Sequence, residues 1–250
     1  MPMLDLVTIP CLKDNYAFLI RDPETGQCAC IDVPDAIPVI EALQERGWKL
    51  GMILLTHHHA DHVQGVAALV EATGAMVLGA RADSARLPRL DRALAEGDRV
   101  TIGGVEGVVL DVSGHTMGHI AFSFPGMCFT ADSLMAGGCG RLFEGSPAVM
   151  WESLQKLAAL PDDTLICSGH EYTASNLRFA ATVDPDNTAL AARIAATARA
   201  NAMAEPTVPS TLALEKATNP FLRAPLLKAA IGKTSDVEAF AEIRARKDKF

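Results

Sequence analysis

The sequence lacks the features of several protein classes. Its 250 residues include six cysteines but no Cys-x-x-Cys pair, which excludes a dense disulfide framework and predicts reduced thiols. Aromatic residues make up only 5% and the formal net charge is −8, so no basic stripe with interleaved aromatics suits nucleic acid. Met1–Asp14 has no basic or apolar leader, and the uncharged run Val112–Ala131 is interrupted by glycine, proline and histidine. We therefore expect a cytoplasmic monomer that binds neither nucleic acid nor membranes.

The distribution of apolar residues, 49% of the chain, predicts an α/β (α+β) protein with a sizeable core. Strands are predicted where short apolar runs are bounded by Gly, Pro, Asp or Asn: Tyr16–Ile20, Cys28–Val33, Met52–Leu55, Met76–Leu78, Val105–Val112, Ile120–Phe124, Met127–Thr130 and Thr164–Cys167. Helical spacing predicts Ala36–Arg46, Val63–Thr73, Pro147–Leu160, Asp186–Ala204 and Thr234–Phe250. Strand patterns vanish from about Ala174 onward, which predicts a strand-rich domain over 1–173 and a helical one over 174–250.

All seven histidines lie in three short motifs: Thr56–His62, Gly114–His119 and Ser168–Tyr172. His57 and His59 are two residues apart, so they share a face in an extended chain but not on a helix. Because a strand-like run precedes this motif and a helical pattern follows it, Asp61 and His62 turn to an adjacent position. One segment can therefore serve two metal ions.

Three further candidate ligands, His115, Asp132 and His170, each follow a predicted strand. Strand ends at one edge of a sheet converge, which is where α/β active sites usually lie. A single histidine after a strand is more often a polar loop residue or a hydrogen-bonded core residue, and a histidine-rich tract can bind metal adventitiously. The combination nevertheless favours a metal site.

The remaining residues near these motifs have simpler interpretations. His58 points away from its neighbours in an extended chain, which favours a structural role, and His119 is expected to support or pack against the site. Glu171 is expected to be solvated or to support His170. Cys139 has no base beside it, so we interpret it as structural.

The His57–His62 segment, with His115, Asp132 and His170, resembles the metallo-β-lactamase superfamily. Within it, the chain resembles the glyoxalase II (hydroxyacylglutathione hydrolase) family over nearly its full length. The resemblance rests on four segments: Gly138–Gly145, Cys167–Thr173, Asn219–Arg223 and Arg244–Phe250. The loop and the tail are far more specific than the histidine motif.

The resemblance implies a four-layer αββα sandwich, here the catalytic domain 1–173, and a helical substrate-binding domain 174–250. It implies one metal ion on His57, His59 and His115, a second on Asp61, His62 and His170, and Asp132 bridging them; Asp61 and Asp132 would be the catalytic residues. It places glutathione contacts at Arg141, Phe143, Tyr172, Arg244 and Lys247. Phe143 stands where the family often has Tyr, Arg141 where Lys also occurs, and Ala131 where Gly is common before Asp132.

The implied activity is hydrolysis of S-2-hydroxyacylglutathione, chiefly S-D-lactoylglutathione, to a 2-hydroxy acid (D-lactate) and glutathione in methylglyoxal detoxification. Two divalent ions, most simply Zn²⁺ but also Fe or Mn, would supply a bridging hydroxide that attacks the thioester. Arg244 and Lys247 share a helix face and could clamp substrate carboxylates; without the resemblance, a solvated basic tail is the more common outcome. The alternatives are a lactonase or other thioesterase of the superfamily, an iron persulfide dioxygenase, or a metal-stabilised binding module.

Overall fold

The computed structural model describes residues 4–250, and these residues form two compact units. The first comprises the described residues up to Asp111 together with Met117–Thr130, and the second comprises Val112–Thr116 and Ala131–Phe250. The mixed α/β class is as predicted. The predicted boundary at residue 173 lies within the second unit, and the division into domains 1–173 and 174–250 stays a prediction.

The first unit is built on a six-stranded sheet of order β1-β2-β3-β4-β5-β6. Pairing is antiparallel from β1 to β3 and parallel from β3 to β6. Every residue of the short strand β3 is buried, as expected of an interior strand. The bounds are β1 Asp5–Cys11, β2 Asn15–Arg21, β3 Cys28–Ile31, β4 Leu50–Leu55, β5 Met76–Ala80 and β6 Arg92–Leu94.

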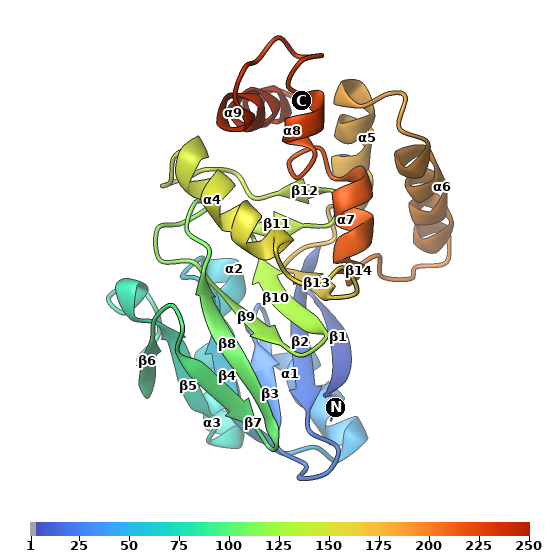
Figure 1. The fold of residues 1–250 in the computed structure, drawn as a ribbon. Helices are drawn as coiled ribbons and strands as arrows, with labels where there is room; N and C mark the ends of the chain where they lie inside the picture. Colours follow the sequence, from blue (N-terminus) through green and yellow to red (C-terminus); the bar gives the residue numbers. More distant parts are fainter. Residues whose placement is uncertain (1–3) are drawn as a thin grey trace. The chain divides into compact units, whose positions relative to one another are not determined.

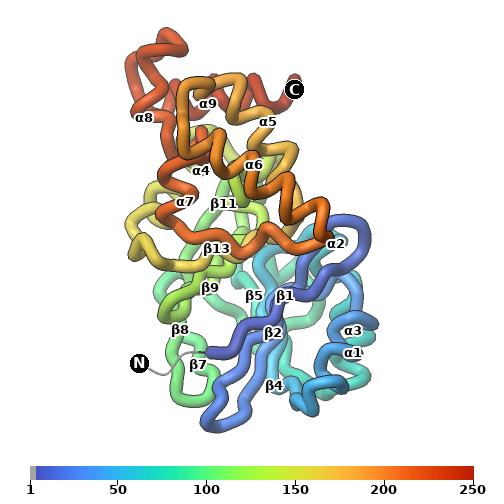
Figure 2. The backbone as a smooth tube through the Cα atoms, turned by 90° about the vertical axis from the view of Figure 1, so that its right-hand side faces the viewer, coloured from blue at the N-terminus to red at the C-terminus, as the bar shows by residue number. Residues whose placement is uncertain are grey.

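The same unit contains an antiparallel run of strands, β7 Arg99–Ile102, β8 Val105–Asp111, β9 Ile120–Phe124 and β10 Met127–Ala131. The predicted Pro125-Gly126 turn is confirmed, because Phe124 pairs with Met127 and Gly126 takes φ 81°. The ring of Phe18 on β2 packs edge-on against Phe129 on β10, with centroids 5.5 Å apart. Figure 2 shows β7–β9 on one side of the β1–β6 sheet and helices α1 (Ala36–Arg46) and α3 (Val66–Thr73) on the other.

The helix predicted over Val63–Thr73 is wrong as a single element. The chain forms a short helix α2 (Ala60–Val63), then α3, and breaks at Gly65. The Gly65 amide donates to Val33 O at 2.9 Å, and a Cβ on Gly65 would lie 2.8 Å from Ala36 N. This close approach to the start of α1 requires glycine and redirects the chain directly after the histidine motif.

The second unit contains two short strand pairs and the helices of the last part of the chain. Its elements are β11 Leu134–Met135, β12 Gly138–Cys139, α4 Pro147–Ala158, β13 Leu165–Ser168, α5 Thr173–Val183, α6 Thr188–Ala202, β14 Ser210–Thr211, α7 Leu212–Thr218, α8 Ala224–Leu227 and α9 Asp236–Lys247. Figure 1 shows α5 beside α6 and α8 beside α9, and both pairs are in contact. A capping box of Ser235 and Glu238 begins α9.

The expectation of no strand beyond Ala174 is wrong at β14. This two-residue strand pairs antiparallel with β13, opposite Leu165 and Ile166. Two residues are too few to produce an alternating pattern, so only the tertiary pairing reveals the strand. Among the described residues, no helix has the length and apolar character needed to cross a bilayer.

Candidate metal centre and substrate contacts

The first histidine motif lies at a strand-to-helix turn, as predicted. Strand β4 ends at Leu55, and His59 is the N-cap residue of α2, which begins at Ala60. The Thr56 carbonyl accepts a hydrogen bond from Ile120 N at 2.9 Å, which ties the start of the motif to β9. His57 and His62 are fully buried, so their ring nitrogens need partners within the protein or a ligand.

Asp32, at the end of β3, determines which nitrogen of two histidines carries the proton. Its carboxylate accepts from Thr56 N (2.9 Å), Thr56 Oγ1 (2.7 Å) and His62 Nδ1 (2.8 Å). A carboxylate only accepts, so His62 Nδ1 donates, and Nε2 of the neutral ring is unprotonated. The Thr56 hydroxyl donates its single proton to Asp32. It must therefore act as the acceptor in its 3.0 Å hydrogen bond with His57 Nδ1. His57 therefore also presents an unprotonated Nε2.

His57 and His59 present nitrogen atoms to a common point. His57 Nε2 and His59 Nδ1 are 3.2 Å apart. Two nitrogens that ligate one zinc ion tetrahedrally at about 2.0–2.1 Å lie about 3.3 Å apart. The spacing therefore fits two ligands of one divalent ion.

Asp61 is partly exposed, with 44% of its side chain accessible. The Asn15 amide donates to Asp61 Oδ2 and to the Asp61 carbonyl, both at 3.0 Å. Asp61 Oδ2 lies 3.9 Å from His62 Nε2. Asn15 thus fixes a carboxylate next to an imidazole lone pair.

His58 and His119 take the supporting roles expected of them. His58 Nδ1 donates to the buried Asp83 at 2.7 Å, and Asp83 also pairs with Arg86. The His119 ring stacks on His57, with centroids 4.6 Å apart and planes 16° apart. His58 and His119 thus support the first histidine motif without using the ring nitrogens of His57, His59 and His62.

The second unit brings three of the predicted ligands together. Asp132 Oδ2 lies 3.5 Å from His115 Nε2 and 3.3 Å from His170 Nε2. All three side chains are buried, and the Gly169 amide, next to His170, donates to Ala131 O, next to Asp132, at 3.1 Å. One carboxylate oxygen between two imidazole nitrogens fits a carboxylate shared by two ions.

The tautomer of His115 is fixed by the loop that follows β12. His115 Nδ1 lies 2.7 Å from the Arg141 carbonyl, which only accepts, so Nε2 again carries the lone pair. The exposed Phe143 ring meets His115 edge-on at 5.3 Å, and the Tyr172 ring stacks on His170 at 4.6 Å. These two aromatic side chains border the ligand imidazoles.

Arg244 is placed differently from a solvent-facing clamp. It is 6% exposed, and its guanidinium donates to Cys139 O at 2.9 Å and to Asp248 Oδ1 at 2.8 and 3.0 Å. The exposed Arg141 side chain lies 3.4 Å from the same Asp248. Arg244 therefore holds the loop that carries Arg141.

Lys247 lies between the rings of Phe179 and Phe250, with its Nζ 5.4 and 5.2 Å from their centroids. Burial, followed by the neighbouring charges of Arg244 and Arg178, lowers the pKa of Lys247. Burial thus disfavours the charged form of Lys247, and an anionic partner would stabilise that form.

Two other expectations concern residues beside these groups. Burial raises the pKa of Cys139 to about 11, so this thiol is not a nucleophile near neutral pH, in agreement with a structural role. Glu171 accepts hydrogen bonds from Thr207 N at 2.9 Å and from Thr207 Oγ1 at 2.5 Å. It therefore holds the segment that follows α6 in place and is not simply solvated.

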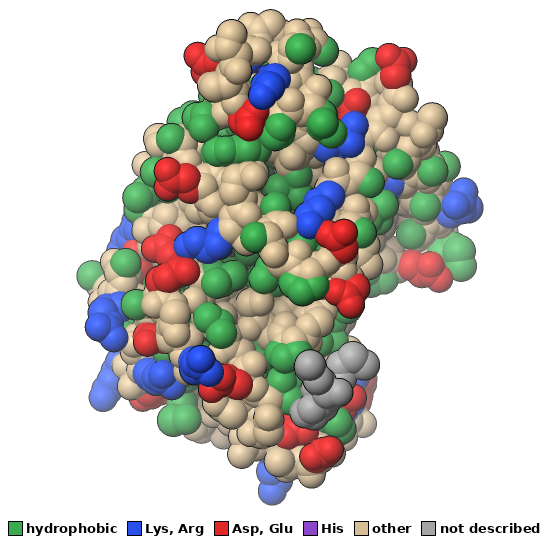
Figure 3. Space-filling view, in the orientation of Figure 1, with side chains coloured by type: hydrophobic (Ala, Val, Ile, Leu, Met, Phe, Trp, Pro, Cys, Tyr) green, Lys and Arg blue, Asp and Glu red, His purple; other side chains and the backbone are tan. Residues whose placement is uncertain are grey.

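The donor set fits divalent metal. Imidazoles, three of them with tautomers set by hydrogen bonds, and carboxylates are ligands that zinc, iron and manganese accept. No histidine reaches the face shown in Figure 3, where acidic and basic side chains are mixed, as expected for buried ligands among the described residues.

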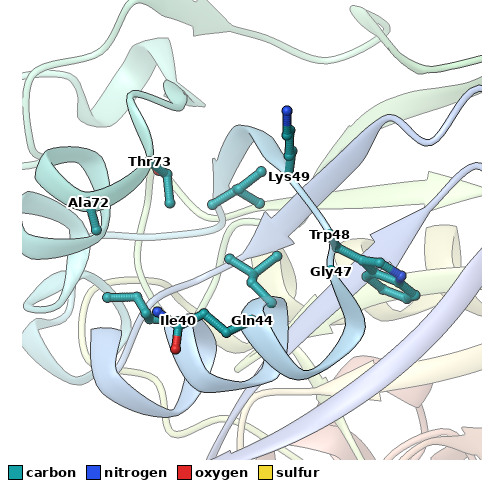
Figure 4. A pocket seen from close by; sticks show the side chains of 9 residues that line it. Ile40, Gln44, Gly47, Trp48, Lys49, Ala72 and Thr73 are labelled. Carbon is teal, nitrogen blue, oxygen red and sulfur yellow. The ribbon is translucent and has the colours of Figure 1, made fainter.

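The surface pocket of about 600 Å³ in Figure 4 lies among Ile40, Trp48, Lys49 and Thr73 and contains none of the candidate metal ligands.

Comparison with known proteins decides the family. The family model described as the metallo-beta-lactamase superfamily matches residues 30–170, and the model of the hydroxyacylglutathione hydrolase C-terminus matches residues 171–250. The chain belongs to the hydroxyacylglutathione hydrolase family. It is 63% identical to the hydroxyacylglutathione hydrolase of Cereibacter sphaeroides, with 99% of both chains covered, and 62% identical to that of Jannaschia sp., with 98% of both covered.

Solved structures support the same superfamily. ETHE1 from Myxococcus xanthus matches with a TM-score of 0.67 and 26% identity, covering 97% of this chain and 90% of that one. TTHA1623 in a di-iron-bound form matches with a TM-score of 0.64 and 29% identity, covering 87% and 100%. The metallo-β-lactamase fold with a helical C-terminal part is therefore confirmed, and the family with its His/Asp donors implies a dinuclear metal site.

The sequence interpretation assigned no role to four buried residues that hold the first histidine motif: Asn15, Asp32, Thr56 and Asp83. Asp32 offered a faint signal, since it is an acidic residue inside the apolar run Cys28–Val33. Its partners, however, are 24 and 30 residues away. No local pattern connects them.

Proposed function

We propose that this protein hydrolyses the thioester of S-2-hydroxyacylglutathione, chiefly S-D-lactoylglutathione, and releases a 2-hydroxy acid and glutathione. The observation that carries the proposal is the 61–63% identity, over nearly the whole chain, to several proteins named hydroxyacylglutathione hydrolase. The match of the C-terminal model over residues 171–250 supports a glutathione substrate rather than a lactone. The other superfamily activities and a pure binding module have no comparable support.

We further propose that two ions are held by seven side chains. His57, His59 and His115 would hold one ion, Asp61, His62 and His170 the other, and Asp132 would bridge them. The fixed tautomers of His57, His62 and His115 support this assignment, as do the two short distances from Asp132 Oδ2. Zinc suits nitrogen-rich ligand sets, and iron is the alternative because a related structure holds two irons.

Such ions would lower the pKa of a bound water to about 7 and polarise the thioester carbonyl. The side chains supply orientation. Asp61, whose carboxylate accepts a hydrogen bond from Asn15, is proposed to orient the attacking water as well as to bind metal. The leaving thiol has an ordinary pKa of about 8.5, so it departs as a thiolate without a general acid. No side-chain nucleophile is required.

The substrate contacts divide into direct and supporting ones. Arg141 and Lys247 are proposed to bind glutathione carboxylates. The Arg141 side chain is 56% exposed, so an anion can reach it, and an anion beside Lys247 would stabilise its charged form. Phe143 and Tyr172, whose rings border His115 and His170, are proposed to contact glutathione. Arg244 is proposed to act mainly through the Arg141 loop, since its own donors are engaged with Cys139 O and Asp248.

The test is thiol release from S-D-lactoylglutathione, combined with elemental analysis of the purified protein. The proposal predicts turnover, about two ions per chain, and loss of activity on chelation with recovery on adding Zn²⁺. Asp132→Ala is expected to abolish turnover and deplete both ions, whereas Asp186→Ala, at an exposed acidic residue, should change neither. A metal-loaded protein without thiol release but with lactone hydrolysis would overturn the substrate assignment. Full activity in Asp132→Ala would overturn the bridge.

A further inference from the structure

A tight hairpin follows Asp132 directly. Strands β11 and β12 pair Leu134 with Cys139 and Met135 with Gly138. The Gly140 amide then donates back to Ser133 O at 3.1 Å. A Cβ on Gly140 would lie 1.9 Å from Asp132 O, so the end of the hairpin presses on the backbone of Asp132 itself. The end of the hairpin is therefore in close contact with the backbone that carries this carboxylate.

Two buried side chains of the C-terminal helices grip the tip of this hairpin. Asn219, the C-cap residue of α7, donates to Met135 O at 3.1 Å and to Gly138 O at 2.8 Å. Glu215 on α7 accepts from Gly137 N at 2.8 Å and from Asn219 Nδ2 at 3.0 Å. Both residues are fully buried. The two side chains thus satisfy the polar backbone groups of the turn together.

Glu215 is held as a buried carboxylate. Arg193 on α6 donates to its Oε1 at 2.5 Å, and Ser210 Oγ donates to the same oxygen at 2.5 Å. Arg193 also donates to Thr218 Oγ1 at 2.7 Å. Burying two charges is costly, and apolar residues of similar volume are often no less stabilising. An apolar pair could not accept the hydrogen bond from the Gly137 amide. A charged acceptor forms such a bond about twice as strongly as a neutral one.

We infer that Glu215 and Asn219 form a positioning clamp for the proposed metal centre. The clamp fixes the β11–β12 hairpin, and the hairpin fixes Asp132 at its start and the Gly140–Arg141 segment at its end. The Arg141 carbonyl in turn accepts from His115 Nδ1. The C-terminal helices therefore preset two metal ligands in addition to any contact with glutathione. The inference rests on the proposed function, because it assigns a role at the same site.

The experiment measures zinc affinity without substrate, by competition with a chromophoric chelator. Asn219→Ala removes the hydrogen bonds to Met135 O and Gly138 O but leaves the Arg193–Glu215 ion pair. Glu215→Gln weakens the hydrogen bond from Gly137 N. Loss of a residue that orients metal ligands typically weakens metal binding about 10–100-fold. We expect at least about a tenfold rise in the zinc dissociation constant for Asn219→Ala, with the fold intact by circular dichroism. Asn219→Gln keeps an amide donor at this position and should therefore retain part of the zinc affinity that Asn219→Ala loses.

Leu190→Ala provides the matched control. Leu190 on α6 is buried against Leu177 and Ala180 on α5, so its truncation destabilises the packing of α5 and α6 while leaving the side chains of Asn219 and Glu215 and their hydrogen bonds in place. It should lower the urea midpoint yet leave zinc affinity unchanged. If Asn219→Ala binds zinc as tightly as the parent, or if Leu190→Ala weakens zinc binding equally, the clamp is merely structural and the inference is wrong. A parent that binds zinc but releases no thiol would instead contradict the proposed activity and leave the clamp standing.

Discussion

Replacing Asp32 by Asn tests whether one buried carboxylate sets the protonation of two metal-binding histidines. Asn is nearly the same size and also tolerates the left-handed backbone that Asp32 adopts at φ 54°. It offers one oxygen acceptor and one NH₂ donor group where Asp32 offers two acceptor oxygens. The three hydrogen bonds to Asp32 cannot all survive this change.

The two orientations of the introduced amide fail in different ways. With its oxygen toward His62, the amide keeps the bonds from Thr56 Oγ1 and His62 Nδ1 but points its NH₂ at Thr56 N. A buried donor left unpaired costs about 1–3 kcal/mol. With its NH₂ toward His62, the amide forces His62 to accept at Nδ1 and carry the proton on Nε2. The Thr56 hydroxyl is then released to donate to His57, which reverses that tautomer as well.

We therefore expect Asp32→Asn to lower the free energy of unfolding by about 1–3 kcal/mol and zinc affinity by about 10–100-fold. The affinity loss corresponds to about 1.4–2.7 kcal/mol. Urea unfolding of the metal-free protein measures the first quantity, and chelator competition measures the second. Asp35→Asn is the control, because Asp35 caps α1 through Ile37 N at 3.0 Å and Asn caps equally well. Parental values of both quantities in Asp32→Asn would refute the tautomer argument.

Three further predictions follow from local chemistry. Since the pKa of Lys247 lies below its usual value of 10.5, its charge is lost at lower pH than for an ordinary lysine; KM for lactoylglutathione should rise on that alkaline limb, and Lys247→Arg should remove the rise. Burial raises the pKa of Cys28 and Cys128 to about 12, so a disulfide reagent should titrate neither in the native protein and both after denaturation; native reactivity would contradict their burial. Gly140→Ala should deplete bound metal, because its Cβ meets a backbone atom that cannot swing aside; normal metal content and stability would mean that the loop relaxes.

The positions of the predicted ligands illustrate how far local pattern reaches. The two-residue spacing of His57 and His59, the strand before them and the helix after them predict the observed turn. The placement of His115, Asp132 and His170 after strands agrees with the structure, and within the second unit these three side chains meet. Such features depend on chain neighbours, which the sequence displays directly.

Arg244 shows where local pattern fails. Its spacing from Lys247 predicts a shared helix face, and the family resemblance places it in contact with glutathione, but neither reveals that its guanidinium is buried against Cys139 O, 105 residues earlier. The break at Gly65 and the strand Ser210–Thr211 are similar cases, because each is decided by a backbone segment distant in sequence. Family motifs report that a residue matters without reporting which atoms it touches.

The amino-acid sequence alone determined the class of fold, the metal-binding residue types and their order along the chain, because periodicity and ligand spacing are local properties. Only the tertiary structure decided which nitrogen of each histidine carries its proton, which cation is exposed, and which helix residues hold the Asp132 hairpin. Those features depend on hydrogen bonds between segments up to 105 residues apart, and a one-dimensional pattern contains no information about such partners.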